Sequence, residues 1–400
     1  MIKREIEEKF KELSKTRKVV LLTGARQIGK STFIKSIKEK DRTYVTLDDL
    51  ALRDLAQNDP KLFLMNYNGP IIIDEVQYAP NLFSYIKEDI DKSNEKGKYW
   101  LTGSQKFELM KNVSESLAGR ISILEMSSLS YAEKKGFKSK IFNPNNISYS
   151  FNVTPEEIFE EIYKGGMPEY INDNLNRNQF FNDYLLTYLE RDVRNLTQVG
   201  DLISFRKFLI AMAARNGEVL NYDSICEDAG IDSTTAKRWV SILEASDIIY
   251  LLKPYFSSEL KRATKTPKII FLDTGLCAYL CNWNSGTNIM NSTSSGHYLE
   301  SFVISELIKN KRNNKESINY DIYYYRDRDK KEIDLIIESD NTIYPFEIKK
   351  TANPDKSMIS NFKILENTNL NVGNGGLICF YPDILPLDEK NKSYPLSVIF

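Results

Sequence analysis

The chain has 400 residues, with 42% hydrophobic and 27% charged side chains, which excludes a disordered or fibrous protein and predicts two to four domains. Its 54 lysines and arginines nearly balance its 55 aspartates and glutamates, so a surface that binds a polyanion would have to be local. No apolar run approaches the ~18–20 residues that cross a bilayer, and four cysteines with one histidine, His297, exclude a disulfide scaffold and disfavour a zinc site. We therefore expect a cytoplasmic protein with free thiols and no membrane partner.

Short apolar runs alternate with helical patterns over the first 135 residues, which is typical of a parallel α/β sheet. Residues 136–200 become polar and then helical, and we interpret them as a helical lid or linker. The strands that we expect in the first part are residues 18–23, 43–47, 70–74, 99–102 and 121–125.

The segment GARQIGKS, from Gly24 to Ser31, fits the phosphate-binding pattern G-x-x-x-x-G-K-[ST] between an expected strand and an expected helix. In such a loop, backbone N–H groups and a helix N-terminus surround the phosphate oxygens. Lys30 would reach the β- and γ-phosphates, and the Ser31 hydroxyl would ligate Mg²⁺. We therefore expect ATP and Mg²⁺ as cofactors. The predicted nucleotide-binding residues are Gly24, Ala25, Arg26, Gln27, Ile28, Gly29, Lys30, Ser31, Thr32 and Gln105.

Two acidic residues, Asp74 and Glu75, end the third expected strand. Parallel strands end at the edge of the sheet where ligands bind, so Asp74 would face the Mg²⁺ that Ser31 holds. Glu75 would polarise the attacking water. The alternative is a helix N-cap and a first-turn acid, which accounts for one carboxylate but poorly for the pair. After the next strand, Ser104 or Gln105 would lie between the acidic pair and the γ-phosphate.

Arg120 follows the segment SESLAG. It could neutralise the charge that develops in the transition state of hydrolysis, either in its own chain or in a neighbouring subunit of a homo-oligomer. The alternative is an ordinary surface arginine in an ion pair.

The segments GARQIGKST, PIIIDEVQYAP, LTGSQKFELM, SESLAGR and GGMPEY, in this order, resemble the AAA+-type P-loop ATPases of bacteria and archaea. The resemblance covers nearly the whole chain and is to the subgroup whose C-terminal half carries a winged helix and a restriction-endonuclease-like domain. It implies that Lys30, Ser31, Asp74 and Glu75 form the nucleotide and Mg²⁺ site, and that Arg120 assists. The expected α/β architecture is a P-loop ATPase core (1–135), a helical region (136–200), a winged helix (201–268) and a PD-(D/E)XK nuclease-like domain (269–400).

Residues 221–245 have the pattern of two helices around a tight turn, and an apolar strand follows at 248–252. Ser233 can cap the second helix, whose Val240 and Leu243 have the spacing of a core-facing side. The sequence therefore predicts a helix-turn-helix with a wing.

The outer face of that second helix offers Lys237, Arg238 and Trp239. The segment 253–268 then adds five positive charges against one negative charge. We expect DNA as a partner, contacted through Lys237, Arg238 and this basic segment. The alternative is a winged helix that serves only for packing or protein contacts.

Two further strands, expected at 332–338 and 342–350, form a hairpin if Asp340 and Asn341 are its two-residue turn. The numbers of opposed residues then sum to 681. Pro345 cannot donate to the ladder, so we expect irregular pairing there.

This register places Asp334 opposite Glu347 and Glu332 opposite Lys349, all on one face. Cross-strand Cβ atoms lie ~4.5–5.5 Å apart, so Asp334 and Glu347 could share a divalent cation, with Glu300 from the preceding helix completing the shell. Lys349 would orient or deprotonate a metal-bound water. This is the D…E-x-K pattern of metal-dependent nucleases, although alternating charges also form ordinary cross-strand ion pairs.

These motifs predict a Mg²⁺-dependent ATPase that couples its nucleotide state to a DNA-binding winged helix and a nuclease-like domain. A function of a different class is a nucleotide-dependent regulator or assembly scaffold, whose C-terminal domain binds a partner without cleaving nucleic acid.

Overall fold

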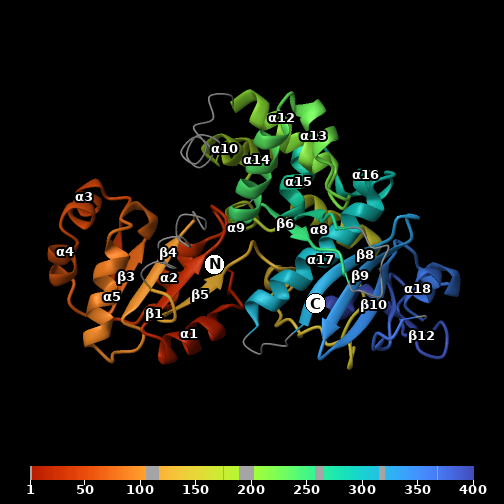
Figure 1. Ribbon diagram of the computed structural model, residues 1–400, viewed down its shortest axis with the longest axis horizontal. Coiled ribbons are helices and arrows are strands. Elements are labelled where there is room, and N and C mark those ends of the chain that lie inside the picture. Colours follow the sequence, from red (N-terminus) through yellow and green to blue (C-terminus); the bar gives the residue numbers. More distant parts are fainter. Residues whose placement is uncertain are drawn as a thin grey trace.

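The structure is a computed structural model that describes residues 2–104, 117–173, 175–188, 202–256, 265–314, 320–366 and 368–400. Figure 1 shows an N-terminal lobe on the left, a layer of helices at the top and a C-terminal lobe on the right. Among the described helices, none is both long and apolar enough to span a membrane.

The N-terminal lobe is built on a sheet of five strands in the order β2-β3-β4-β1-β5 (Figure 1). Every neighbouring pair is parallel, which confirms the α/β fold expected for this part of the chain. Because β4 lies between β1 and β3, the loops after these three strands meet at one edge. The strands are β1 (Val19–Thr23), β2 (Thr43–Thr46), β3 (Ile71–Asp74), β4 (Tyr99–Gly103) and β5 (Ile121–Glu125).

Helices cover both faces of this sheet. Successive side chains of β1 point to opposite faces and enter two separate apolar clusters, Val20 with Phe33 and Val19 with Phe63. The helices are α1 (Glu7–Thr16) and α2 (Lys30–Ile37) on the first face, and α3 (Leu50–Asn58), α4 (Pro60–Asn66) and α5 (Leu82–Lys92) on the second. A short 3-10 helix, η1 (Val76–Tyr78), follows β3.

Among the described residues up to Tyr188, four helices follow β5, and the turn before the third of them returns to the segment that leaves the sheet. The N–H of Leu129 donates to the carbonyl of Gly166 at 2.7 Å, so the turn before α9 lies against the segment that leaves β5. The helices are α7 (Tyr131–Lys135), α8 (Pro155–Lys164), α9 (Pro168–Asp173) and α10 (Arg177–Tyr188).

A unit of three helices and a two-stranded antiparallel sheet follows at the top of Figure 1. The two helices and the tight turn expected at 221–245 are present, and Gly230, with φ 68°, ends the first helix. The elements are α12 (Leu202–Ala214), α13 (Tyr222–Ala229), α14 (Ser233–Ala245), β6 (Ile249–Leu252) and β7 (Lys268–Phe271).

Two details predicted for α14 were wrong. Asp232, rather than Ser233, caps the helix, because its carboxylate accepts from two backbone N–H groups of the first turn. Trp239 is buried against Phe205 and Phe208 of α12 instead of lying on the outer face. A large indole gains more from that apolar contact than from exposure.

The C-terminal lobe contains a mixed sheet of six strands in the order β12-β13-β11-β10-β9-β8. Strands β8, β9 and β10 are antiparallel, whereas β10, β11 and β13 are parallel. The strands are β8 (Tyr320–Arg326), β9 (Glu332–Ser339), β10 (Thr342–Ile348), β11 (Gly376–Cys379), β12 (Leu385–Pro386) and β13 (Lys392–Pro395). Helices α15 (Thr274–Leu280) and α16 (Gly286–Met290) precede this lobe, lie in the upper layer of helices and contact α8 (Figure 1). The helices that follow are α17 (Ser295–Asn313), η3 (Lys356–Phe362), α18 (Lys363–Glu366) and η4 (Leu396–Ile399).

The predicted register of the β9–β10 hairpin is confirmed. Ser339 pairs with Thr342, so opposed numbers sum as expected, and both turn residues, Asp340 and Asn341, have positive φ. The irregular pairing expected at Pro345 was wrong, because Pro345 lies opposite Ile336 in an unbroken register.

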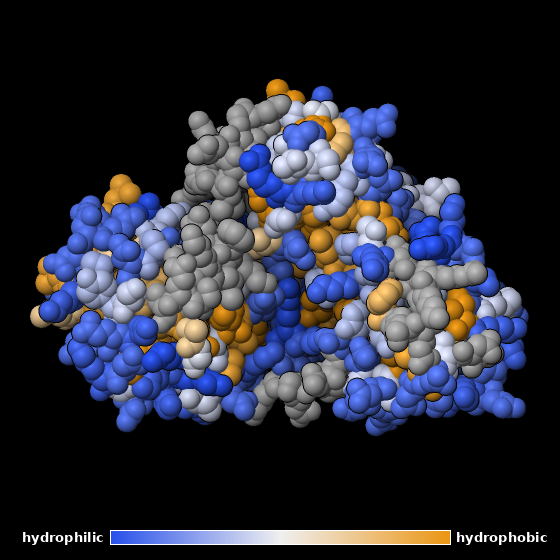
Figure 2. All heavy atoms as spheres, in the orientation of Figure 1, coloured by the Kyte–Doolittle hydropathy of each residue, from blue (hydrophilic) through white to orange (hydrophobic). Residues whose placement is uncertain are grey.

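Helix α17 is buried along most of its length and connects the lobes. One apolar cluster extends from Ile6 through α8, α12 and α17 to Phe400. Figure 2 shows hydrophilic residues over much of the visible surface and a hollow between the left and right lobes. The lobes therefore pack around a shared core.

Candidate nucleotide site and C-terminal carboxylate cluster

The loop between β1 and α2 has a backbone that requires glycine at its first position. Gly24 has φ 142°, and a Cβ there would lie 2.1 Å from the carbonyl oxygen of Met126. Gln27 and Gly29 also have positive φ, and Gly29 caps α2. The loop is therefore pressed against the segment that leaves β5.

Lys30 and Ser31 begin α2 and point toward this loop and toward β3. The Lys30 ammonium donates to the carbonyls of Gly24 and Ala25, at 3.0 and 2.6 Å. The Ser31 hydroxyl donates to a carboxylate oxygen of Asp74 at 3.1 Å. The two motifs that the sequence placed 43 residues apart therefore meet in space.

Asp74 is held by hydroxyl groups from three elements. Besides Ser31, Tyr44 on β2 donates to it at 2.5 Å, and Thr102 on β4 contacts the oxygen that Ser31 also contacts. Burial, together with the hydrogen bond to Asp74, raises the pKa of Tyr44 well above its ordinary value. Sequence reasoning missed Tyr44 and Thr102, although Thr102 ends an expected strand beside the acidic pair.

Glu75 follows Asp74 in the left-handed conformation, with φ 58°. Such a conformation costs a non-glycine residue on the order of 1–3 kcal/mol and is concentrated at functional sites. Its N–H donates to the Thr102 hydroxyl at 3.2 Å, and its carboxylate accepts from the Gln77 amide. Thr102 therefore fixes both acidic positions at the strand edge.

A cavity of about 920 Å³ lies over this loop. Its lining includes Glu75 and Ser104, together with Glu169, Asn172 and Asp173 of α9. The α9 residues were missed, because only the fold brings α9 to the loop. Of the predicted nucleotide-binding residues, those that line the cavity are Arg26, Gln27, Ile28, Gly29, Lys30, Ser31 and Thr32.

The donor atoms at this edge fit Mg²⁺, which prefers oxygen ligands. Ser31 offers a hydroxyl and Asp74 a carboxylate, and the buried Ser104 hydroxyl has no hydrogen-bond partner among the described residues. Gln105, the other residue predicted at this position, lies outside the described residues.

Arg120 immediately precedes β5. Because Ile121 lies beside Val19 in a parallel pair, Arg120 is at the edge of the sheet opposite the phosphate loop. Its guanidinium forms two hydrogen bonds with Asp91, at 2.8 and 3.3 Å, on the surface. The structure does not bring Arg120 to the cavity of its own chain, and action in a neighbouring subunit stays a prediction.

In the C-terminal lobe, carboxylates of Glu300, Glu332 and Asp334 converge, and one oxygen from each lies within 4.8 Å of the others. We call these three residues the carboxylate cluster. Glu300 comes from α17, as expected, and the other two come from β9. Glu332 was expected on this face opposite Lys349, but not among the metal ligands.

Lys349 lies beside Asp334 and Glu347, at 2.8 and 2.7 Å from their carboxylate oxygens. Burial would raise the pKa of Asp334, but Lys349 and Lys268 lower it. Burial and the Asp334 charge raise the pKa of Glu347 to about 9. The predicted trio of Asp334, Glu347 and Lys349 is therefore assembled, and Glu347 Oε1 is buried without a hydrogen-bond partner among the described residues.

One residue of the predicted DNA-contacting set was placed wrongly. Lys268 is buried, and its ammonium lies 2.5 Å from an oxygen of Glu300 and 2.5 Å from one of Glu332, so it cannot reach a phosphate backbone. Lys237 and Arg238 are exposed on α14. The lysine and arginine at 261 and 262 lie outside the described residues.

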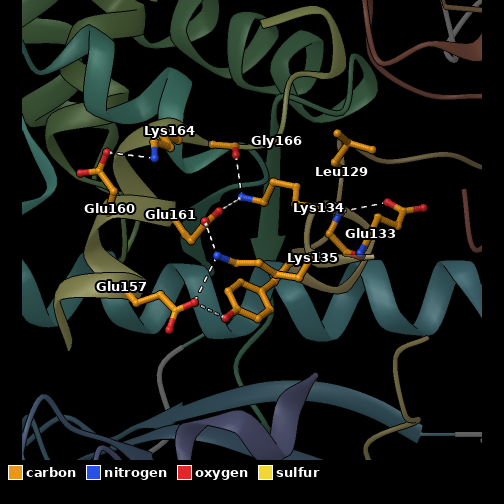
Figure 3. Close-up of polar contacts among 12 residues, drawn as sticks. Leu129, Glu133, Lys134, Lys135, Glu157, Glu160, Glu161, Lys164 and Gly166 are labelled. Carbon is orange, nitrogen blue, oxygen red and sulfur yellow. Dashed lines mark hydrogen bonds and ion pairs between the residues drawn. The ribbon is translucent and has the colours of Figure 1, made fainter. Parts of the chain in front are cut away.

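Polar contacts join the nucleotide lobe to the helices that follow it (Figure 3). Lys134 of α7 pairs with Glu161 of α8 at 2.5 Å and donates to the Gly165 carbonyl at 2.8 Å. Lys135 pairs with Glu157 and Glu161, at 3.1 and 3.2 Å. Helix α7 is thus held firmly against α8, which precedes the α9 wall of the cavity.

Arg4 ties the phosphate loop to the same junction. Its guanidinium donates to the Ile28 carbonyl at 2.9 Å, to the Ser127 carbonyl at 2.6 Å and to Glu133 of α7 at 3.0 Å. Arg4 therefore connects the loop at Ile28 directly to α7 through hydrogen bonds.

Parallel strands, a glycine-rich loop before a helix and an adjoining strand-end carboxylate together define a P-loop nucleotide-binding domain. Residues 16–134 match a family model described as an AAA domain, so the N-terminal lobe resembles an AAA-like P-loop ATPase domain. Residues 155–287 and 295–399 match two models that are described as domains of unknown function, DUF8612 and DUF4143.

The chain is similar to proteins of a bacterium and of an archaeon. The chain is 28% identical to "Uncharacterized protein Mb2031c" of Mycobacterium bovis over 343 residues, covering 85% of this chain and 72% of the relative. It is 26% identical to "Uncharacterized protein MJ1637" of Methanocaldococcus jannaschii over 341 residues, covering 76% and 70%. Among solved structures, the Walker-type ATPase paby2304 of Pyrococcus abyssi has a TM-score of 0.45 and 16% identity, covering 69% of this chain and 94% of that chain.

Proposed function

We propose that the protein binds ATP with Mg²⁺ at the phosphate loop and hydrolyses it. The observation that carries this proposal is the 3.1 Å hydrogen bond from Ser31 to Asp74, which joins the two halves of a nucleotide–metal site. Bound Mg²⁺ would neutralise phosphate charge. Lys30 would leave the loop carbonyls for the phosphates, and Glu75 would accept a proton from the attacking water.

The test is ATP hydrolysis by the full chain and by three variants. Lys30→Ala should lose hydrolysis and most binding, whereas Glu75→Gln should bind ATP but hydrolyse it at least ~100-fold more slowly. Lys40→Ala changes an exposed lysine in the loop after α2 and should behave as wild type. Wild type that binds no ATP or GTP would contradict the proposal.

For the C-terminal lobe, we propose a metal-dependent nuclease of the PD-(D/E)XK class. The proposal is supported by Lys349, which contacts both Asp334 and Glu347, and by the unpaired buried oxygen of Glu347. A divalent ion would lower the pKa of a bound water. The chain's own contribution would be to hold that ion with carboxylates and to place Lys349 beside it.

The test of this activity is cleavage of single- and double-stranded DNA and RNA in Mg²⁺ or Mn²⁺, by wild type and by Asp334→Ala. Cleavage lost in the variant supports a nuclease. If neither wild type nor Lys268→Met, which removes the ammonium from Glu300 and Glu332, cuts any of these substrates, the second candidate holds, namely a nucleotide-dependent regulator or scaffold whose C-terminal domain binds a partner.

We also propose that the three helices with β6 and β7 form a winged helix that contacts DNA through the exposed Lys237 and Arg238. Acidic residues on the neighbouring α13, including exposed Glu227 and Asp228, would weaken that contact. The expected binding to duplex DNA is therefore salt-dependent and weak, and the double variant Lys237→Glu/Arg238→Glu should abolish it. Binding that the double variant leaves unchanged would exclude this surface.

A further inference from the structure

Lys268 belongs to one structural unit by its backbone and to another by its side chain. Its backbone begins β7 and pairs with Leu252 of β6, within the unit that contains the helix-turn-helix. Only 1% of the residue is exposed, and its side chain enters the carboxylate cluster of the C-terminal lobe. There its ammonium lies 2.5 Å from oxygens of both Glu300 and Glu332.

The charged groups around the cluster already include counter-ions. Lys268 contacts Glu300 and Glu332, Lys349 contacts Asp334, and Arg326 lies 3.4 Å from the other oxygen of Glu332. The Tyr324 ring lies 5.2 Å from the Lys268 ammonium and covers it. A buried ammonium of this kind is stable only while its carboxylate partners stay in place.

The donor set suits a divalent ion, because three carboxylates offer oxygens within 4.8 Å of one another. However, the Lys268 ammonium uses two of these three carboxylates. A divalent ion and the ammonium would repel each other and would compete for the same oxygens.

We propose that Lys268 is a tethered counter-ion that closes the carboxylate cluster to divalent metal while β7 is docked. The idea rests on the cation-binding role proposed above for the C-terminal lobe. High-affinity metal binding then requires the ammonium to leave Glu300 and Glu332. Because Lys268 is part of the β6–β7 sheet, a partner that displaces this sheet raises the metal affinity of the cluster, and metal binding favours the displaced sheet to the same degree.

The experiment measures Mn²⁺ binding to the nucleotide-free full chain, by electron paramagnetic resonance and by the shift in unfolding temperature. Lys268→Met keeps the length of the side chain but removes its charge. It should bind Mn²⁺ at least about tenfold more tightly than wild type. Saturating Mn²⁺ should raise its unfolding temperature by more than about 3 °C while leaving that of wild type unchanged.

Adding Asp334→Asn to Lys268→Met should remove the increase in Mn²⁺ affinity. That loss would show that the additional Mn²⁺ binds at the carboxylate cluster and not at the phosphate loop. Lys268→Arg keeps the charge and should stay as insensitive to Mn²⁺ as wild type. The proposal is overturned if wild type gains stability from Mn²⁺ in a manner that Asp334→Asn abolishes, a comparison that needs no folded Lys268→Met. It is also overturned if folded Lys268→Met binds no more Mn²⁺ than wild type. ATP hydrolysis by wild type, and nucleic-acid cleavage by folded Lys268→Met beside wild type, test the proposed activities separately, because only the variant has a cluster that is open to metal without a partner.

Discussion

Glu300 and Arg312 lie about 18 Å apart along α17 and contact opposite parts of the molecule. Glu300 accepts from Lys268 in the carboxylate cluster. Arg312 pairs with Glu125 at the end of β5, at 2.8 Å, and with Asp247 just before β6, at 2.7 Å. One buried helix therefore joins the nucleotide lobe to the C-terminal cluster.

Replacing Arg312 should be strongly destabilising, because it leaves the buried carboxylate of Asp247 without its partner. We expect Arg312→Met to lower the free energy of unfolding by about 3–5 kcal/mol in urea titrations. The neighbouring Lys311 forms an exposed pair with Asp321, so Lys311→Met should change it by less than about 1 kcal/mol. Equal losses in the two variants would argue against α17 as a buried connection.

Gly24→Ala should impair the phosphate loop, because the added Cβ would meet the Met126 carbonyl at 2.1 Å. We expect a loss of ATP affinity of at least ~10-fold and a lower unfolding temperature. Gly69→Ala is the matched control, since Gly69 has a similar φ, 153°, with no atom within 4 Å of an added Cβ. ATP affinity that survives Gly24→Ala would mean that the loop does not need this close approach.

Tyr44→Phe should weaken hydrolysis through Asp74, because it removes one of the hydroxyl donors to that carboxylate. The expected effect is a ~10-fold higher Mg²⁺ concentration for half-maximal hydrolysis, with ATP binding little changed. Tyr85→Phe, at a partly exposed position on α5, serves as control. The same Mg²⁺ dependence in Tyr44→Phe and wild type would show that Tyr44 does not position Asp74.

The stability of the protein should fall as pH rises, in part because of Glu347. Burial and the charge of Asp334 raise its folded pKa to about 9, whereas the ordinary value is 4.5. The folded state therefore keeps a proton on Glu347 that the unfolded chain releases. The contribution of this proton to the free energy of unfolding is complete below about pH 4.5 and is lost as the pH approaches 9.

The matching measurement is urea unfolding of wild type and Glu347→Gln between pH 6 and 9. As the pH rises, the free energy of unfolding of the wild type should fall more steeply than that of the variant, by on the order of 1 kcal/mol per pH unit. Glu338→Gln, on the same hairpin, controls for the loss of a carboxylate. Parallel pH profiles for wild type and Glu347→Gln would contradict a protonated Glu347.

Local pattern was sufficient to predict the elements that depend on neighbouring residues. The loop after β1, the acidic pair at the end of β3 and the Asp340–Asn341 turn all follow from short-range rules. The hairpin register then placed Asp334 and Glu347 together without any tertiary information.

What the sequence could not supply was the packing between distant segments. Lys268 looked like one charge in a basic stretch, but the fold buries it among carboxylates from α17 and β9. Trp239 was assigned to a surface that α12 in fact covers. Tyr44 reaches Asp74 only because β2 and β3 are neighbours in the sheet.

The most direct measurement is a calorimetric titration of ATP into the full chain in saturating Mg²⁺, with Lys30→Ala and Lys40→Ala beside it. We predict saturable binding of one ATP per chain to wild type and Lys40→Ala, and at least ~100-fold weaker binding to Lys30→Ala. Equal binding by wild type and Lys30→Ala, or no heat with either ATP or GTP, would contradict a triphosphate site at this loop.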